Sequence, residues 1–191
     1  MYCVKSPLAI EDSIKKSRFI AIIFPCQTIH EASYHLNRLH LEYPDANHIV
    51  FAYRIKTEKG IVIKFHDAGE PCGTAGKPIY QHLEGKNLIN LLCVVIRYFG
   101  GIKLGPGGLT RAYGNSAKKV IAASQLTQYI EYVEVIYSLD YKQLQVFEYQ
   151  LKKLNGKIIK QEFSDKINLI IKIPESNALK LANLFETINR K

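Results

Sequence analysis

The spacing of apolar residues along the chain predicts alternating strands and helices. Short segments that are continuously apolar, or that alternate with polar residues, are typical of strands, whereas apolar residues three or four positions apart predict helices. The dipeptide Lys59-Gly60 predicts a hairpin turn between two such strands. In the first two thirds of the chain we predict strands at 18–25, 48–55, 61–65 and 88–99, a short segment at 79–83, and helices at 29–42 and 109–124.

A second series of elements follows residue 129. The order β-α-β-β-α predicted there is that of a ferredoxin-like module without its final strand. We therefore predict an α+β protein with two domains, residues 1–128 and residues 129–191. The second series consists of a strand at 131–139, a helix at 141–154, strands at 157–163 and 167–173, and a last helix from 175 to about 188.

Composition narrows the class of protein and of partner. The 191 residues carry a formal net charge of +9, which favours binding to nucleic acid, an anionic protein or a membrane surface. The alternative interpretation is that the charge only keeps a solvated surface soluble. The start of the chain lacks the apolar core of a signal peptide, and the longest strongly apolar run, 88–96, is too short to span a bilayer. The four cysteines form no Cys-x-x-Cys pair. We therefore expect a cytoplasmic protein without a membrane anchor, disulfide framework, metal site or cofactor.

Glycine is concentrated in one part of the chain. Ten of the twelve glycines lie between Gly69 and Gly114, mostly in two runs, and no acidic residue occurs between Gly85 and Ile130. The second run joins a predicted strand to a predicted helix, where free backbone N–H groups and the helix dipole favour an anion. It matches neither the P-loop nor the dinucleotide-binding fingerprint. The alternative interpretation is that the glycines only form tight turns.

Basic side chains accompany the second glycine run. Arg111, Asn115 and Lys118 are four and three positions apart, so they share one face of the predicted helix. This arrangement suits contacts with phosphate groups, and nearby aromatic rings could add stacking if they are exposed. We therefore predict a site for RNA or another anion. Its candidate residues are Arg97, Lys103, Gly107, Gly108, Arg111, Asn115, Lys118 and Lys119.

The first glycine run contains His66, Asp67 and Glu70, which could serve as acid, base or metal ligands. A structural role is favoured, because carboxylates in loops commonly accept hydrogen bonds from the N–H groups of their own turn. The alternative is a hydrolase acting on a small phosphorylated or peptide-like substrate, with one pocket joining His48 and both carboxylates to the Gly100-Gly101 turn. No catalytic residue is assigned. The residues of this second candidate site are His48, Arg54, Asp67 and Glu70.

Four segments of the chain resemble a known family. They are Lys16-Ser-Arg-Phe19, the stretch 48–54, the pattern Asp67-x-Gly-Glu-Pro-x-Gly-Thr-Ala-Gly-Lys-Pro78, and the pattern Arg97-Tyr-Phe-Gly-Gly-Ile-Lys-Leu-Gly-x-Gly-Gly-Leu-x-Arg-Ala-Tyr113. Over nearly the whole chain the sequence is similar to the IMPACT family, specifically its bacterial YigZ-like branch. The resemblance implies that the first domain has the fold of ribosomal protein S5 domain 2, also seen in the fourth domain of elongation factor G. It implies that the second domain is similar to the last domain of that factor.

The resemblance also implies a function. Eukaryotic members of the family are linked to control of translation initiation through a protein partner of a stress kinase, and the bacterial branch has inferred roles in nucleic-acid or ribosome binding. The chain departs from the family at Ala68, where a second acid is usual, and at His66, which replaces a small residue. The loss of the second acid further disfavours an enzyme. We therefore predict a non-catalytic regulator of translation that binds RNA, the ribosome or a translation-associated protein through its basic, glycine-rich face.

Overall fold

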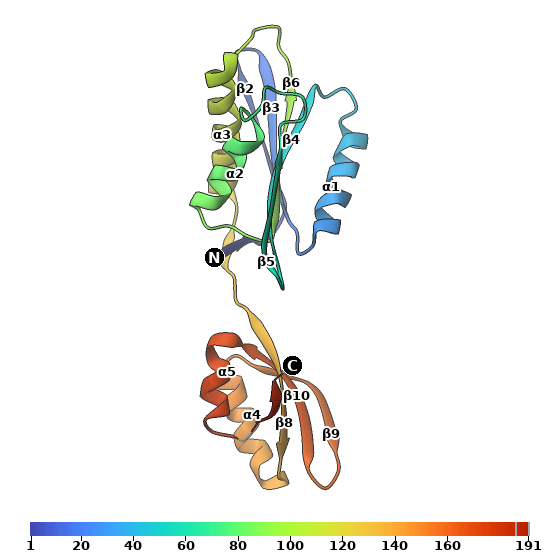
Figure 1. Ribbon diagram of the computed structural model, residues 1–191, viewed down its shortest axis with the longest axis vertical. Coiled ribbons are helices and arrows are strands. Elements are labelled where there is room, and N and C mark those ends of the chain that lie inside the picture. Colours follow the sequence, from blue (N-terminus) through green and yellow to red (C-terminus); the bar gives the residue numbers. More distant parts are fainter. Residues whose placement is uncertain (186, 191) are drawn as a thin grey trace. The chain divides into compact units, whose positions relative to one another are not determined.

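The computed structural model describes residues 1–185 and the backbone of residues 187–190, and it combines β-sheets with helices (Figure 1). The chain forms two compact units, Met1–Tyr129 and Ile130–Lys191. Unit 1 contains a five-stranded sheet and a two-stranded sheet, and unit 2 contains a four-stranded sheet. The chain is therefore an α+β protein.

Unit 1 is built around an antiparallel sheet with helices on both faces. The strand order is β2-β3-β6-β4-β5. Helix α1 lies on one face of this sheet, and α2 and α3 lie together on the other (Figure 1). The short strands β1 and β7 pair with each other. The bounds are β1 Tyr2–Val4, β2 Leu8–Ile14, β3 Ser17–Pro25, α1 Ile29–Glu42, β4 His48–Thr57, β5 Gly60–His66, α2 Gly76–Gly85, β6 Leu91–Tyr98, α3 Gly105–Ala123 and β7 Leu126–Gln128.

Strand β6 is apolar on both sides because each face of the sheet carries its own core. Cys93 and Val95 pack with residues of α2 and α3, whereas Val94 and Ile96 pack with residues of α1. A strand covered on both faces has no side that can be polar, so its sequence is a continuous apolar run rather than an alternating one. This central strand carries Arg97 at its end, next to the second glycine run.

Most predicted elements of unit 1 are present, some with shifted ends. Helix α1 has the predicted bounds, and β4 and β5 form the predicted hairpin. The segment predicted at 79–83 is part of helix α2, and α3 begins at Gly105 rather than at residue 109. The first turn of α3 was not predicted because it consists of Gly and Pro, which have low helix propensity. Pro is nevertheless common at the first position of a helix. The prediction lacks β1, β2 and β7, which are short or lie at a sheet edge.

Gly100 marks the point at which the second glycine run meets the turn between β2 and β3. A Cβ atom at this position would lie 1.9 Å from the backbone oxygen of Lys16, so no side chain fits there. The Gly100 N–H donates a hydrogen bond to the Ser17 hydroxyl, 3.2 Å away. The close approach therefore anchors the loop that leads from β6 into α3.

Unit 2 has the order β-α-β-β-α-β. Its antiparallel sheet has the strand order β11-β8-β10-β9, and α4 and α5 contribute to one apolar core with β8 and β10. The prediction of a last helix to about residue 188 is wrong: α5 ends at Ala182, and residues 187–190 pair with β8 as a fourth strand. A short apolar segment does not distinguish helix from strand, and the otherwise open edge of β8 selects the strand. The bounds are β8 Tyr132–Leu139, the 3-10 turn η1 Tyr141–Gln143, α4 Leu144–Lys153, β9 Lys157–Phe163, β10 Ile167–Pro174, α5 Glu175–Ala182 and β11 Thr187–Arg190.

Candidate functional site

The carboxylate of Asp67 organises the first glycine run. It accepts hydrogen bonds from the backbone N–H groups of Gly73, Ala75 and Gly76 at 2.9, 3.0 and 2.8 Å. Burial favours the neutral acid, but the three hydrogen bonds outweigh it and hold the pKa of Asp67 below its ordinary value. Asp67 therefore fixes the loop that leads into α2, which is the structural role favoured by the sequence.

Glu70 belongs to a buried network in unit 1. Its Oε1 accepts hydrogen bonds from Arg97 Nη1 at 2.6 Å and from the Tyr113 hydroxyl at 2.7 Å, and His48 Nε2 is 3.7 Å away. The side chains of Glu70 and Arg97 are only 4% and 5% exposed. Arg97 Nη2 also lies 3.4 Å from the Ser17 hydroxyl. Burial, reinforced by the Glu70 carboxylate, raises the pKa of Tyr113, so its hydroxyl stays a donor at neutral pH.

Two arginines of the predicted sites, Arg97 and Arg54, have structural roles. Arg97 is neutralised by Glu70 inside unit 1, which corrects its assignment to an anion-binding surface. Arg54 is buried and donates to the backbone oxygens of Leu83 and Leu88, at 3.3 and 3.1 Å, so it holds the chain at the end of α2. This contact corrects the placement of Arg54 in the acidic candidate site.

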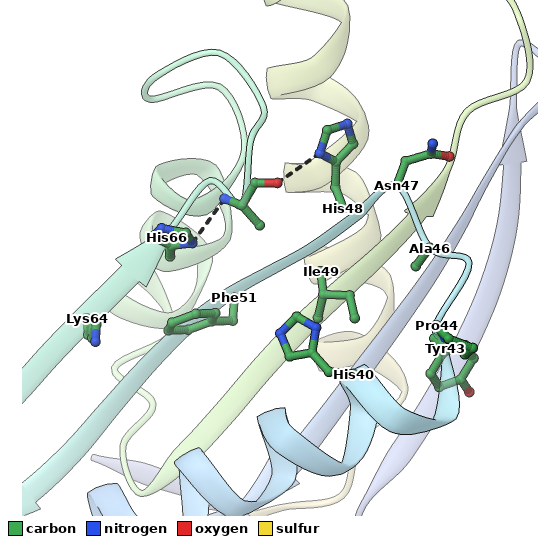
Figure 2. A pocket seen from close by; sticks show the side chains of 11 residues that line it. His40, Tyr43, Pro44, Ala46, Asn47, His48, Ile49, Phe51, Lys64 and His66 are labelled. Atoms are coloured by element: carbon green, nitrogen blue, oxygen red, sulfur yellow. Dashed lines mark hydrogen bonds between the residues drawn. The ribbon is translucent and has the colours of Figure 1, made fainter.

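Two pockets lie beside the buried network, and they divide the residues expected to form one. The larger, about 520 Å³, is lined by His48 but by neither carboxylate (Figure 2). The smaller, about 270 Å³, is lined by Glu70 and Arg97 but not by His48. His48 and Glu70, expected in one pocket, therefore line separate ones, and Asp67 lines neither of the two. We call the larger the histidine pocket; it contains His40, Tyr43, Asn47, His48, Phe51, Lys64 and His66.

The outer face of α3 carries unpaired cations. Arg111, Asn115 and Lys118 are exposed, while residues on the opposite side of the helix pack into the core. Among the residues that the structure describes, neither Arg111 nor Lys118 has an acidic partner, whereas Lys119 is bound by Asp12 of β2. Lys103 is exposed in the loop before the helix. We call Lys103, Arg111, Asn115 and Lys118 the basic α3 face.

The first turn of α3 leaves its N–H groups uncapped, while Arg111 Nε donates to the Gly107 carbonyl at 3.3 Å. A Cβ atom at Gly107 would meet no other heavy atom within 4 Å, so packing does not require glycine at this position. A Cβ atom at Gly108 would lie 3.1 Å from that of Leu104. The first N–H groups of a helix have no partner within the helix, and no side chain caps this one. A ligand can therefore approach the backbone next to Arg111.

No local sequence signal predicts the histidine pocket. Lys64 and His66 are two positions apart, which places them on the same face of a strand. Nothing in the sequence brings His40 of α1 opposite them. Likewise, Ser17 and Tyr113 join the buried network only through contacts between distant parts of the chain.

Cys72 is an exposed free thiol among the described residues, which form no cluster of metal ligands and no membrane-spanning helix. Within them, no group of three or more His, Cys, Asp or Glu side chains is placed to hold a metal ion. Burial raises the thiol pKa of Cys26 and of Cys93 to about 12, so both are protonated and weakly nucleophilic at neutral pH. No helix in this part of the chain is long and apolar enough to cross a membrane.

Comparison with known proteins extends over both units. Residues 15–121 match the Impact N-terminal domain, and residues 138–185 match a domain of unknown function, DUF1949. An IMPACT family member from Haemophilus influenzae is 36% identical over 172 residues, which cover 90% of this chain and 84% of that protein. The IMPACT family member YigZ from Escherichia coli is 34% identical over 173 residues, which cover 88% and 83%.

Among solved structures, the crystal structure of a hypothetical protein is similar, with a TM-score of 0.70 and 30% identity over 96% of this chain and 89% of that one. The agreement with relatives therefore spans the fold as well as the sequence motifs. The chain belongs to the IMPACT family, in its bacterial YigZ-like branch.

Proposed function

We propose that this protein is a non-catalytic regulator of translation that binds RNA, free or within the ribosome, through the basic α3 face. One observation carries the proposal: Arg111 and Lys118 project from one helix with no acidic partner among the described residues. Asp12, Asp67 and Glu70 have other partners: Lys119, backbone N–H groups of the first glycine run, and Arg97. A cationic stripe whose charge is not neutralised within the protein favours a polyanion.

The chemistry of the face suits phosphate. The guanidinium of Arg111 can donate two parallel hydrogen bonds to one phosphate group, and Lys118 adds a point charge about two turns further along the helix. Asn115 lies between them and supplies an amide donor. The uncapped first turn of α3 adds the positive end of the helix dipole.

The family resemblance supports the same role. Likeness of the two units to ribosomal protein S5 domain 2 and to domains of elongation factor G would relate the fold to the translation machinery. A translation-associated protein, as for eukaryotic members of the family, is the other kind of partner to consider. A function in translation would place this protein in the cytoplasm.

The engaged carboxylates favour binding over catalysis. A general base needs a lone pair within reach of substrate. Both oxygens of Asp67 accept backbone hydrogen bonds, and Oε1 of Glu70 accepts from Arg97 and Tyr113. The hydrolase alternative would therefore have to use Glu70 Oε2, on a carboxylate whose negative charge is already balanced by Arg97.

Reversing the two helix cations is expected to remove most RNA affinity. We predict that Arg111→Glu with Lys118→Glu lowers the affinity for a labelled single-stranded RNA about tenfold or more, because two phosphate contacts become repulsive. The slope of log K against log salt should become shallower by about 1.4, or about 0.7 per lost contact. Fluorescence anisotropy at several salt concentrations measures both quantities.

The matched control is Lys5→Glu with Lys59→Glu, which changes the net charge equally at two exposed positions off α3. It should lose much less affinity. Equal losses in the two double variants would mean that net charge alone governs binding, and unchanged RNA affinity in the α3 variant would contradict the proposal.

Gly107→Ala separates stability from binding. Alanine is the better helix former and its Cβ fits open space, so the free energy of unfolding should rise by about 0.5–1 kcal/mol. RNA affinity should fall, since the methyl group covers the backbone that a phosphate approaches. Gly85→Ala, in α2, is the control, because a Cβ atom there also meets nothing within 4 Å. Equal RNA affinities for the Gly107→Ala and Gly85→Ala variants would show that the first turn of α3 does not contact the RNA.

A further inference from the structure

We infer that the histidine pocket is a second binding site, specific for a nucleoside phosphate. It lies on the face of the unit 1 sheet that carries α1, whereas the basic α3 face lies on the other side (Figure 1). The two sites therefore use different surfaces. The proposal does not depend on RNA binding by α3.

The floor of the pocket is aromatic and flat. Phe51 of β4 lies directly opposite His66 of β5 in the strand register, which places both side chains on one face. Their rings are stacked, with centroids 5.8 Å apart and planes 25° from parallel. Tyr53, two residues along β4, has its ring centroid 6.3 Å from that of Phe51 and its plane 12° from parallel, but it is buried and does not line the pocket. A planar heterocycle laid on Phe51 would meet a π surface that accepts any base.

Hydrogen-bond donors surround this floor. His66 Nδ1 accepts from the Ala68 N–H at 3.1 Å, so the proton of its neutral ring is on Nε2, which has no partner among the described residues. Asn47 Oδ1 accepts from the Phe99 N–H at 2.7 Å, which leaves its NH₂ group as a donor. In Figure 2, His40 faces the floor from α1, and Lys64 lies on β5, two residues before His66.

The charge of the pocket selects an anion. Lys64 is exposed and has no ion-pair partner in the part of the chain that is described, and it lies opposite Tyr53 in the register, on the same face as Phe51. Among the described residues no acid lines the pocket, and Glu70, whose Oε1 lies 3.7 Å from His48 Nε2, is paired with Arg97. His48 closes one end, with its Nδ1 donating to the Ala68 carbonyl at 2.9 Å (Figure 2). A phosphate group would therefore meet donors and a cation without an opposing carboxylate.

These two properties together define the ligand class. An inorganic anion would leave the aromatic floor unused, and an uncharged aromatic would leave Lys64 and the imidazoles unused. A nucleoside phosphate uses both, and a volume of about 520 Å³ is within the usual range for small-molecule sites. The same chemistry is available from a free mononucleotide and from an unpaired nucleotide of RNA.

The test uses AMP, adenosine, inorganic phosphate and a short oligoadenylate as probes, with binding followed by NMR shifts of the aromatic and backbone signals. AMP should shift Phe51 and His66 and bind more tightly than adenosine or phosphate alone. Lys64→Gln, at an exposed position, should lower AMP affinity about tenfold while leaving adenosine affinity unchanged. Phe51→Leu, which keeps an apolar side chain, should lower the affinity for both AMP and adenosine about tenfold.

The controls lie on the same hairpin and on the opposite face. Lys59→Gln removes a lysine from the tip of the β4-β5 hairpin and should leave AMP affinity unchanged, as should Arg111→Glu with Lys118→Glu. Pocket shifts with AMP would identify a free nucleotide as ligand, and shifts only with oligoadenylate would identify an RNA nucleotide. Absence of pocket shifts with both probes, or equal AMP affinities for the Lys64→Gln and Lys59→Gln variants, would overturn the inference.

Discussion

Replacing Glu70 with Gln is expected to lower the free energy of unfolding of unit 1 by about 3–5 kcal/mol, because the change leaves a buried charge without its partner. Arg97 is 5% exposed at its side chain and has its closest contact with Glu70 Oε1, at 2.6 Å. The neutral amide keeps the shape of the side chain but not the charge that balances the guanidinium. The loss is therefore electrostatic, with little change in packed volume.

Urea denaturation measures this loss, with hydrogen exchange at the β6 amides reporting on unit 1 separately from unit 2. Tyr113→Phe is the informative comparison, since it removes one hydrogen bond to Glu70 but leaves the ion pair, and it should cost about 1.5–3 kcal/mol. Glu11→Gln, in the exposed pair with Arg18, should have no measurable effect. A Glu70→Gln loss no larger than that of Tyr113→Phe would mean that Arg97 finds water or another partner when the carboxylate is gone.

Asp67→Asn is expected to destabilise unit 1 by about 2–3 kcal/mol at neutral pH. Asp67 Oδ1 accepts from Ala75 and Gly76, and Oδ2 accepts from Gly73. An amide supplies only one oxygen, so its NH₂ group must face at least one backbone N–H that then loses its acceptor. Faster hydrogen exchange at Gly73, Ala75 and Gly76 would locate the effect in this loop.

The same residue makes stability depend on pH with a definite sign. The pKa of Asp67 is lowered in the folded protein, so its contribution is complete well above its ordinary pKa of about 4 and disappears as the pH falls through the lower folded value. The difference in stability between the native chain and Asp67→Asn should therefore shrink in acid. Asp45→Asn, at an exposed position, is the control and should leave the acid transition unchanged. A constant difference from pH 7 to pH 3 would show that the carboxylate charge is not what stabilises the loop.

Local patterns were sufficient for most elements and for the family. Apolar spacing located α1 and the β4-β5 hairpin, because burial on one face imposes a period on neighbouring residues, and a continuous apolar run located the central strand, which is buried on both faces. The two glycine-rich motifs identified the family before any geometry was known. Two elements with a weak apolar pattern were not predicted. Strand β2 lies at a sheet edge, and β11 is stabilised by pairing with the distant strand β8 rather than by its own sequence pattern.

The roles of individual charged residues needed the three-dimensional contacts. Arg97 and Arg111 occur in the same acid-free stretch, and nothing in the sequence shows that one is buried and the other exposed. Folding places Glu70, 27 positions away, against Arg97 and leaves Arg111 exposed. The histidine pocket likewise requires α1 and β5 to face each other. Neighbours in the sequence therefore account for helices, strands and motifs, whereas burial and pairing arise between distant segments, and these determine which cations remain free to bind a ligand.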